Sequence, residues 1–416
     1  MNLIADFHIH SRYSRATSPQ MELESLEKWA KIKGIKVLGT GDFTHPQWFK
    51  NLKEKLESSE AGLFKLKNSN SGVRFILSAE ISDIYSKGGK VRKIHNLILA
   101  PSFEAAEKIN TQLGWVGNLK ADGRPILGLD SKELAKIVFN TSNECIIIPC
   151  HIWTPWFSLF GSKSGFDSIE ECFDEYSKYI FSGETGLSSD PAMNWRLSAL
   201  DKITLVSNSD AHSPQKIGRE ANVFNLENLS YSAIIEAIKS KNPKKFLYTI
   251  EFFPEEGKYH YDGHRNCGIS LSPKESKKYN NVCPVCGKIL TIGVLNRVEQ
   301  LADRPEGFKP QGLIPFKSLI PLSEIIIESL GVSSETKETL KEYKNLIEKF
   351  GNEFKILLEI NQEDLKSTTL PEIAEGIIRT REGKVYIEPG YDGVYGKIKI
   401  FSKEEKKDLT QQKTLF

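Results

Sequence analysis

The first half of the chain alternates short apolar segments with amphipathic ones. Each apolar segment predicts a buried strand, and in chain order these segments cover residues 2–10, 35–45, 73–81, 93–100, 145–153 and 202–212. The amphipathic segment at 17–34 predicts a helix, with Ser18 as a candidate N-cap, Pro19 at the first helical position and Gly34 as its end. The alternation predicts a parallel, barrel-like α/β domain over roughly residues 1–240.

The second part of the chain has a different pattern. Residues 245–263 predict a hairpin around a Pro-Glu-Glu-Gly turn, and a segment rich in cysteine and histidine follows. Beyond it, apolar residues at helical spacing predict a mainly helical region, which leads into a glycine-punctuated tail. We therefore expect a small module and then a helical domain after the α/β domain.

The composition is that of a globular protein, with 39% hydrophobic and 26% charged residues among 416. No run of about 18 apolar residues indicates a membrane span, and the N-terminus lacks the basic and apolar regions of a secretory signal. We therefore expect a cytoplasmic protein without a membrane partner. The net charge of +2 indicates no partner by itself, and the six cysteines do not have the pattern of a secreted disulfide framework.

Six of the eight histidines lie at or near predicted strand ends, where such folds place functional residues, and acidic residues accompany them. These candidate metal ligands are His8, His10, Asp42, His45, Glu80, His95, His151, Asp210 and His212. Residues i and i+2 of a strand face the same side, so His8 and His10 can point at one ion. A lone histidine is usually a surface or core residue, but this grouping predicts a hydrolase with two or three divalent ions.

The motifs that carry these ligands resemble those of the polymerase and histidinol phosphatase (PHP) superfamily. The matching segments, in order, are DFHIHSRYS, GIKVLGTGDFTH, LSAEI, HNLILA, PCHIW and SNSDAH. The resemblance implies a distorted seven-stranded β/α barrel with a phosphoesterase centre of two or three ions, which are zinc, manganese, magnesium or iron.

The resemblance also implies how the ligands are shared between the ions. His8, His10, Glu80 and Asp210 would hold the first ion, and Glu80 would bridge to a second ion held by His95 and His151. A third ion would take His212 with Asp42 or His45. The chain departs from the superfamily pattern at this third position, because Gly41-Asp42-Phe43 replaces the usual Thr-Asp-His and no ligand follows soon after His10.

A second cluster of metal-ligand residues lies in the small module. Its spacing is His264-x2-Cys267-x15-Cys283-x2-Cys286, which fits one structural zinc ion with four ligands. Three incidental free cysteines are the alternative interpretation, and His260 is an alternative fourth ligand. Zinc binding would contribute folding free energy to a module that is too small for a large core.

Aromatic and basic residues near the predicted centre could contact a nucleic acid. Trp153, Trp156 and Phe157 follow His151, and exposed aromatic rings stack on bases. Packing of these rings into the core is an equally good interpretation. Arg219 could reach a phosphate from the rim of the centre, although an ordinary surface arginine is the favoured interpretation.

The blocks downstream of the barrel resemble those of the endonuclease Q family. They read GKYHYDGHRNC…CPVCGK, GVLNRVEQLADRPEG and PGYDGVYGKIKIF. The resemblance implies a PHP barrel at 1–245, a zinc-binding module at 246–300, a helical C-terminal domain at 301–400 and a flexible tail at 401–416. Simple PHP phosphatases lack these blocks.

The resemblance implies a DNA repair endonuclease that acts on double- or single-stranded DNA with a damaged base. It would hydrolyse the bond on the 5′ side of uracil, hypoxanthine, xanthine or an abasic site, and it would leave a 3′-hydroxyl and a 5′-phosphate. An enzyme that recognises damaged bases is expected to extrude the damaged nucleotide from the duplex into a pocket. Asp190, in a block that matches the family, is the candidate catalytic carboxylate, or a helix N-cap before Pro191.

Two further interpretations of the function stay open. One is a small-molecule phosphatase of the histidinol phosphate type, which the extra domains disfavour, and the other is a DNA-binding scaffold without activity. No G-x-x-x-x-G-K-[ST] loop supports ATP-driven unwinding. The C-terminal QQKTLF resembles the start of a sliding-clamp-binding motif at Gln412 and Leu415, and a frayed tail is the alternative.

Overall fold

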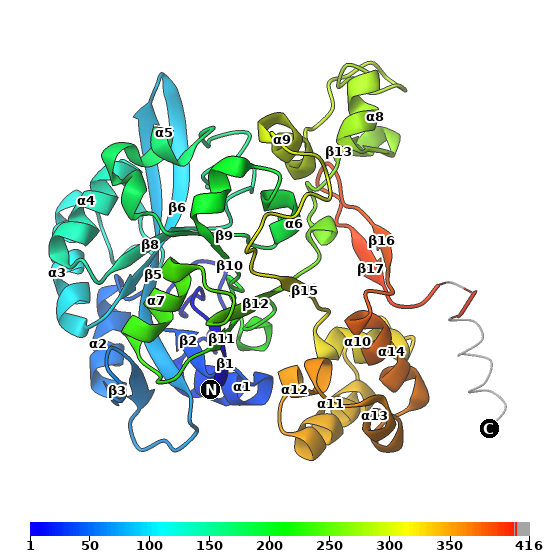
Figure 1. Ribbon diagram of the computed structural model, residues 1–416, viewed down its shortest axis with the longest axis horizontal. Helices are drawn as coiled ribbons and strands as arrows, with labels where there is room; N and C mark the ends of the chain where they lie inside the picture. The colour runs from blue at the N-terminus through cyan, green and yellow to red at the C-terminus, as the bar shows by residue number, and fades with distance from the viewer. Residues whose placement is uncertain (403, 406–416) are drawn as a thin grey trace.

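A computed structural model describes residues 1–402 and 404–405 of the chain (Figure 1). The predicted clamp-binding residues Gln412 and Leu415 therefore lie outside the described residues. No helix in the described part is long and apolar enough to cross a membrane.

The largest sheet takes its strands from both halves of the chain. Its order is β15-β12-β11-β1-β2-β5-β4-β3, with β6 and β7 paired to β5 and β8 paired to β6. The strands are β1 (Asn2–Asp6), β2 (Val37–Gly39), β3 (Leu56–Ser58), β4 (Phe64–Leu66), β5 (Arg74–Lys87), β6 (Lys90–Ala100), β7 (Ile126–Leu127), β8 (Ile146–Pro149), β11 (Ala221–Asn225), β12 (Phe246–Glu251) and β15 (Phe316–Ser318).

The sheet is mixed, and this corrects the prediction of a parallel sheet. β1, β2 and β5 are parallel neighbours, but β5 and β6 form a long antiparallel hairpin, and β11 runs antiparallel to β1. The hairpin turns at Gly88 and Gly89, whose φ angles of +62° and +72° suit the tight turn that reverses two strands. A pair of glycines therefore replaces the helical crossover that a parallel pair needs.

Two further strands carry the pairing from β8 back towards β1. β9 (Ser182–Glu184) and β10 (Thr204–Val206) are parallel partners. The backbone N–H of Ile152, after β8, donates to Glu184 O at the end of β9, and the N–H of His10, after β1, donates to Ala211 O beyond β10. These contacts bring the ends of β1, β8, β9 and β10 to one rim.

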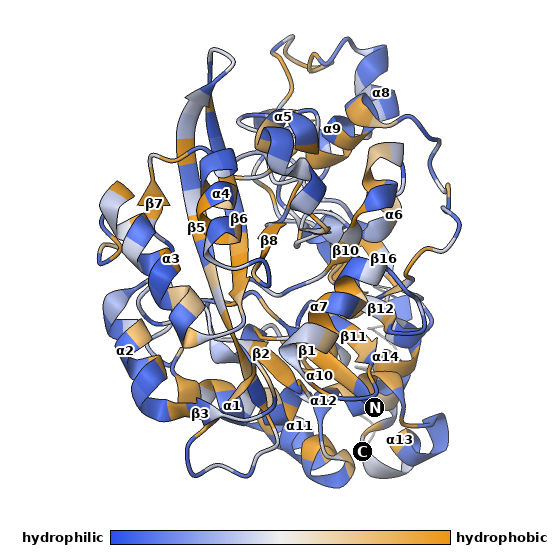
Figure 2. Ribbon diagram, turned by 60° about the vertical axis from the view of Figure 1, so that its left-hand side comes forward, coloured by the Kyte–Doolittle hydropathy of each residue, from blue (hydrophilic) through white to orange (hydrophobic). Residues whose placement is uncertain are grey.

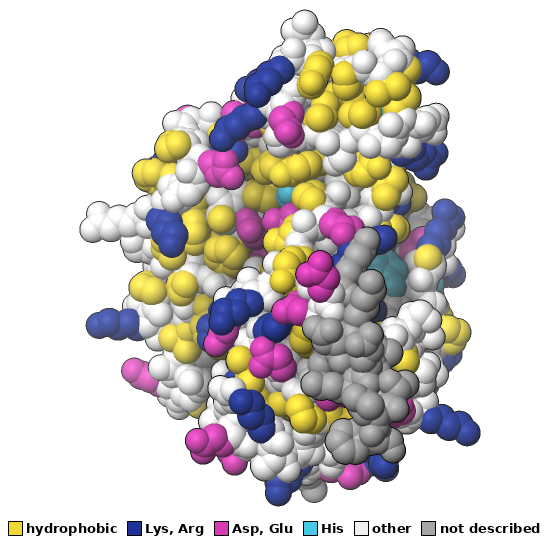
Figure 3. All heavy atoms as spheres, turned by 90° about the vertical axis from the view of Figure 1, so that its right-hand side faces the viewer, with side chains coloured by type: hydrophobic (Ala, Val, Ile, Leu, Met, Phe, Trp, Pro, Cys, Tyr) yellow, Lys and Arg dark blue, Asp and Glu magenta, His cyan; other side chains and the backbone are white. Residues whose placement is uncertain are grey.

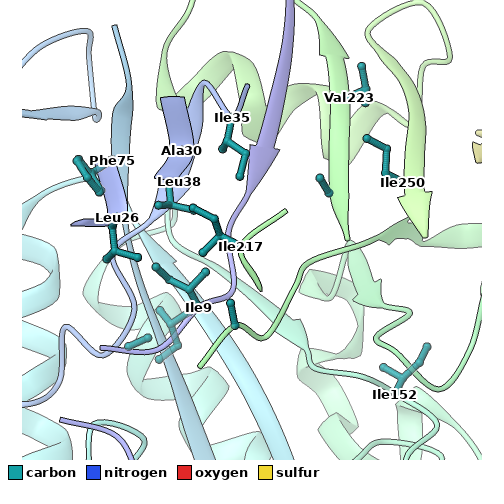
Figure 4. Packing of buried hydrophobic residues seen from close by; sticks show 14 of the residues in the cluster. Ile9, Leu26, Ala30, Ile35, Leu38, Phe75, Ile152, Ile217, Val223 and Ile250 are labelled. Atoms are coloured by element: carbon teal, nitrogen blue, oxygen red, sulfur yellow. The ribbon is translucent and has the colours of Figure 1, made fainter. Parts of the chain in front are cut away.

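Helices cover the outer face of this α/β part (Figures 1 and 2), and their polar sides point outward. They are α1 (Leu23–Lys33), α2 (Pro46–Lys55), α3 (Phe103–Val116), α4 (Ser131–Thr141), α5 (Ile169–Phe173) and α7 (Tyr231–Ser240). Between them and the strands lies an apolar core, which includes Ile9, Leu38, Phe75 and Ile217 (Figure 4). The short, largely buried α6 (Pro191–Asn194) instead contacts α9 (Val294–Leu301) of the second part of the chain.

The first helix begins four residues later than Pro19, the position that its sequence pattern predicts. The backbone N–H of Ser18 donates to His212 O and that of Arg12 donates to Met21 O, so these contacts fasten the segment before α1 to the rim. The helix ends at Gly34, as predicted, with a φ of +92° that suits glycine.

The second part of the chain contains the predicted helical region. Its elements are β13 (Asp262–His264), β14 (Ile269–Leu271), α8 (Pro273–Lys278), α9 (Val294–Leu301), α10 (Leu322–Ser329), α11 (Lys337–Phe350), α12 (Glu353–Leu358), α13 (Gln362–Thr368), α14 (Pro371–Arg381), β16 (Tyr386–Glu388) and β17 (Lys397–Lys399). The mixed α/β fold with a helical C-terminal region is thus confirmed. The domain boundaries stay a prediction.

The hairpin predicted over 245–263 is wrong. β12 pairs instead with β11 and with β15, so the large sheet continues past the α/β half of the chain. The Pro254–Glu256 segment is a single 3-10 turn rather than the tip of a hairpin. Proline carries no N–H for a ladder, and the long-range partner in β15 could not be read from local spacing.

Candidate metal centre

Two histidines after β1 converge with a glutamate of β5 and an aspartate after β10. His10 Nε2 lies 3.2 Å from Glu80 Oε2 and 3.0 Å from Asp210 Oδ1. His8 Nε2 lies 3.5 Å and 3.8 Å from the same two oxygens. His8, His10 and Glu80 are buried, whereas the side chain of Asp210 is 25% exposed and lies on the open side. The structure therefore brings together the four residues predicted for the first ion.

The other oxygen of Glu80 faces a second pair of histidines. Glu80 Oε1 lies 2.7 Å from His95 Nδ1 and 3.3 Å from His151 Nε2, and these two ring nitrogens are 3.3 Å apart. Burial lowers the pKa of His95 to about 4 against the effect of Glu80, so the ring is neutral, as a metal-bound imidazole must be. Glu80 thus presents one oxygen to each ligand set, as a bridging carboxylate would.

The donor set fits divalent metal ions. His8 Nε2, His10 Nε2 and Asp210 Oδ1 are buried polar atoms without a hydrogen-bond partner, and they all face the same point. Burying an unpartnered polar atom is unfavourable, so such atoms usually bind an ion or a water molecule. Imidazole nitrogen and carboxylate oxygen are the common ligands of zinc, manganese and iron.

Carboxylates outside the centre hold the first two histidine rings in place. Glu184 Oε2 lies 2.9 Å from His8 Nδ1, and Asp42 Oδ1 lies 3.0 Å from His10 Nδ1. Each contact occupies one ring nitrogen and leaves Nε2 to face the centre. The thiol of Cys150 also lies near His8 and Glu184, but burial raises its pKa well above the usual value, so we expect it to stay protonated.

Hydroxyl groups orient the rings of the second pair of histidines in the same way. Ser82 Oγ lies 3.1 Å from His95 Nε2, and Thr154 Oγ1 lies 3.1 Å from His151 Nδ1. All four rings are therefore oriented by a contact on the nitrogen that faces away from the centre. This arrangement is typical of metal-binding histidines.

Three residues in the centre or in contact with it have unusual backbone conformations. The φ angles of Asp42, His151 and Asp210 are +48°, +30° and +47°. Non-glycine residues rarely adopt positive φ, and such strain gathers at functional sites. The strand ends are thus bent to place these side chains.

Replacing Glu184 with glutamine is expected to weaken metal binding, because the ring of His8 would lose its charged partner. We expect a loss of affinity of about 10- to 100-fold. Titration of the demetallated protein with Mn²⁺ measures this loss. Glu170→Gln on the exposed side of α5 is the control and should bind like the parent; equal affinity in both variants would contradict the orienting role of Glu184.

The structure does not gather the residues predicted for a third ion. Within residues 1–402 and 404–405, none of the clustered ligand groups contains Asp42, His45 or His212. Two side chains that the sequence reasoning missed contact the centre instead: Glu184, and Arg124, whose Nη1 lies 3.1 Å from Glu80 Oε2. Glu184 is an acid at a strand end, a signal shared with Glu80, whereas no local pattern marks Arg124.

Asp190 has the position of a helix cap. It precedes α6, and its Oδ1 accepts a hydrogen bond of 2.8 Å from the N–H of Met193. The residue lines a cavity of about 630 Å³ with His260 and Glu255, and it joins none of the metal-ligand groups in the described chain. The geometry thus shows the capping role, and the predicted catalytic role stays a prediction.

The predicted nucleic-acid residues have different environments. Trp153 is fully buried and its Nε1 donates to Asn194 Oδ1, which corrects its prediction as a base-stacking residue. Phe157 packs on the ring of His95 at 4.7 Å. Trp156 is 43% exposed and lines a cavity of about 490 Å³ that also contains Arg219. Of the four predicted nucleic-acid residues, Trp156 and Arg219 therefore line this cavity.

The small module gathers the four residues of the predicted zinc site. The ligand atoms of His264, Cys267, Cys283 and Cys286 all lie within 4.8 Å of one another. Burial raises the pKa of the Cys283 thiol, but backbone N–H groups at Cys286 and Val285 outweigh this effect and bring it to about 6. A thiolate at this turn favours zinc. His260, the alternative ligand, does not join this group.

The tip of this module carries apolar side chains on its surface. Val285 is 66% exposed and Ile289 is 79% exposed. In the space-filling view of Figure 3, apolar side chains gather at the upper end of the molecule, with basic residues beside them. Tyr279, at the end of α8, is also exposed.

Two family models match parts of the chain. The family described as PHP-associated matches residues 195–243, and the family described as MJ0043 C-terminal domain matches residues 321–384. Protein MJ0043 of Methanocaldococcus jannaschii is 37% identical over 257 residues, or 59% of this chain, but the chain spans only 31% of that relative. Protein YqxK of Bacillus subtilis is 29% identical over 95% of this chain and 99% of its own length.

Two solved structures are similar over nearly the whole chain. The lesion-specific endonuclease PfuEndoQ from Pyrococcus furiosus has a TM-score of 0.86 and 31% identity, and the match covers 99% of both chains. An endonuclease Q in complex with a 27-mer duplex substrate, which has an abasic lesion at its active site, has a TM-score of 0.84 and 32% identity over 98% of both chains.

Proposed function

Because the chain belongs to the endonuclease Q family, we propose that this DNA repair endonuclease hydrolyses the phosphodiester bond on the 5′ side of a damaged nucleotide. The damage classes are uracil, hypoxanthine, xanthine and abasic sites. The observation that carries the proposal is Glu80, whose two oxygens face two histidine pairs in a chain that aligns almost end to end with two such enzymes.

The bound ions and the side chains around them would have different roles in the reaction. Divalent ions bound by the two ligand sets would activate a water molecule and offset the charge that develops on the phosphate oxygens. The water oxygen attacks phosphorus and the bond to the 3′ oxygen breaks, which leaves a 3′-hydroxyl and a 5′-phosphate. Asp42 and Glu184 keep the rings of His10 and His8 aimed at the centre, and the burial of Glu80 excludes competing water molecules.

A cavity beside the centre is suited to an extruded base. Thr154, which contacts His151, lines it together with Trp156 and Tyr259, whose rings lie 6.1 Å apart. Aromatic rings offer stacking surfaces for a base that has left the duplex. Arg219 lines the same cavity, and its Nε donates to the backbone oxygen of Ser209, next to Asp210. Its remaining N–H groups are in a position to meet the flanking phosphate.

Replacing Trp156 with alanine is expected to weaken binding of a duplex with one deoxyuridine by roughly 5- to 100-fold, because a stacking surface is lost. Fluorescence anisotropy with a metal-loaded, cleavage-resistant duplex measures the affinity. Trp115, 80% exposed at the end of α3, provides the matched control, since Trp115→Ala removes an aromatic ring outside the cavity. Equal losses in both variants would contradict the pocket.

Comparison of substrates tests the proposal. The protein with divalent metal should cut a labelled duplex that carries one deoxyuridine and should leave the undamaged duplex intact. A small phosphomonoester, such as histidinol phosphate, should release little free phosphate. Rapid release of phosphate from the monoester with no cut in the duplex would favour the small-molecule phosphatase instead.

A further inference from the structure

Asp42, one of the ligands predicted for a third ion, has no free oxygen to offer. Its Oδ1 contacts His10 Nδ1 at 3.0 Å. Its Oδ2 accepts hydrogen bonds from Ser11 N at 2.6 Å, from Ser11 Oγ at 2.6 Å and from Ser14 Oγ at 2.9 Å. This carboxylate is saturated with local partners, so a metal ion would have to displace several of them.

A glycine also closes the space beside Asp42. A Cβ atom built on Gly123 would lie 2.3 Å from Asp42 Oδ2 and 2.4 Å from Ser14 Oγ. The backbone of this loop therefore packs directly on the carboxylate. Only glycine permits so close an approach.

The two histidines predicted for the third ion lie apart from each other and have separate local contacts. His45 caps α2, where its Nδ1 accepts from the N–H of Trp48, and its ring stacks on Tyr13 at 4.4 Å. His212 Nδ1 lies 2.8 Å from the backbone oxygen of Asp210. Each of these polar contacts occupies Nδ1 and not Nε2, but among the described residues neither ring joins Asp42 in a group of ligand atoms. The three predicted residues therefore do not assemble a third site.

Arg124 brings a positive charge to this side of the centre. Its Nη1 lies 3.1 Å from Glu80 Oε2, the oxygen that also faces His8 and His10. The nearby carboxylate of Glu80 raises the pKa of this guanidinium, burial opposes that effect and Asp210 adds to it. The side chain is 25% exposed, so some N–H groups of the guanidinium reach the open side of the centre.

The loop that carries Arg124 is held in place from several sides. Gly123 N–H donates to Tyr13 O at 2.9 Å, and Thr44 Oγ1 donates to Gly123 O at 3.3 Å. The N–H of Arg124 donates to Asp122 Oδ1, and Ser82 N–H donates to Pro125 O at 3.0 Å. These bonds fix the loop, so the guanidinium is pre-positioned rather than a mobile surface arginine.

We infer that Arg124 takes the place of a third ion: the centre holds two divalent ions, and the guanidinium binds a non-bridging oxygen of the phosphate between them and the solvent. A planar guanidinium suits a phosphate, which it can bind through two N–H groups. The inference deepens the proposed function, because it names what holds the phosphate group of that substrate. It does not depend on which lesion is cut.

Positions of the metal ions test the first half of the inference. Crystals of the metal-loaded protein should show two anomalous peaks in the centre, one beside His8 and Asp210 and one beside His95 and His151, with Glu80 between them. A further peak liganded by Asp42, His45 or His212 would overturn the inference.

Binding of inorganic phosphate to the metal-loaded protein tests the second half. By calorimetry, Arg124→Gln should bind phosphate roughly 10- to 100-fold more weakly than the parent, with an unchanged metal content. Arg124→Lys keeps the charge and should recover only part of the affinity, because an ammonium group lacks the planar pair of N–H groups that binds two phosphate oxygens. Arg15→Gln is the matched control, since Arg15 pairs with Asp122 of the same loop but is 77% exposed, and it should bind like the parent.

Two results would overturn the phosphate role of Arg124. One is equal phosphate affinity in Arg124→Gln and the parent. The other is loss of the metal ions together with phosphate in both Arg124 variants, since the guanidinium would then serve only to hold Glu80. Normal phosphate binding in a parent that does not cut a deoxyuridine duplex would contradict the proposed function and leave this inference standing.

Discussion

Replacing Glu80 with glutamine is expected to reduce cleavage of a lesion-containing duplex by roughly 10³-fold or more. Glu80 is the residue shared by the two ligand sets, with one oxygen facing His10 and the other facing His95. An amide keeps the size of the side chain but offers no charge and only one oxygen. Both sets would lose their common ligand, whereas the aromatic residues of the cavity beside the centre would be unchanged. Single-turnover cleavage together with anisotropy separates these two effects.

Glu236→Gln provides the control for this variant. Glu236 is exposed on α7, away from the centre, and the substitution is chemically identical. It should cleave and bind like the parent. A Glu80→Gln protein that folds, binds the duplex and still cuts at more than about a tenth of the parental rate would contradict the bridging role.

Replacing Cys283 with serine is expected to remove one zinc equivalent per chain and to unfold the small module. Structural zinc contributes about 10–16 kcal/mol of apparent binding free energy to isolated zinc-finger peptides at neutral pH. The module around His264, β14 and α8 has few buried apolar side chains of its own, so it depends on the metal. Elemental analysis gives the zinc content, and limited proteolysis should show new cuts confined to about residues 264–290.

Cys145→Ser serves as the control for that experiment. Cys145 is buried in the α/β core and belongs to neither metal-ligand cluster. This variant should keep its zinc and its protease resistance in the module, even if its core is less stable. Retention of full zinc by Cys283→Ser would show that the Cys3His group is not the zinc site.

The convergence of the main ligands could be predicted from the sequence because it depends on local rules. His8 and His10 are two residues apart at a strand end, so alternation places both on one side. Glu80 lies within a run of apolar residues, and a charged residue there needs a partner. The same reasoning predicted the Cys3His group from its spacing, and the structure gathers its four residues.

Other features depend on partners that are distant along the chain, and local patterns do not reveal them. Asp42 follows a strand like the other candidate ligands, but its contacts with Ser11 and Ser14 leave it as an orienting group. No local pattern marks Arg124. Its place beside Glu80 depends on the packing of the neighbouring Gly123 against Asp42, which is distant along the chain. The parallel sheet was predicted from alternating elements, and the two glycines at the β5–β6 turn overturned it.

The burial of the aromatic residues could not be predicted either. Trp153 and Trp156 follow the same histidine three residues apart, and nothing in their local sequence distinguishes them. Trp153 is buried and contacts Asn194, at the end of α6, whereas Trp156 lies on the surface. The position of Asn194 beside Trp153 depends on the fold and not on the local sequence.

The central claim is that this metal centre breaks the phosphodiester bond on the 5′ side of a damaged nucleotide. Mapping the product ends of a duplex that carries one deoxyuridine, at single-nucleotide resolution, tests that claim most directly. We expect a single cut in the damaged strand, with a 3′-hydroxyl on the upstream fragment and a 5′-phosphate on the fragment that begins with the lesion, and no cut by Glu80→Gln. A cut on the 3′ side of the lesion, removal of the base without strand cleavage, or an intact duplex would contradict it.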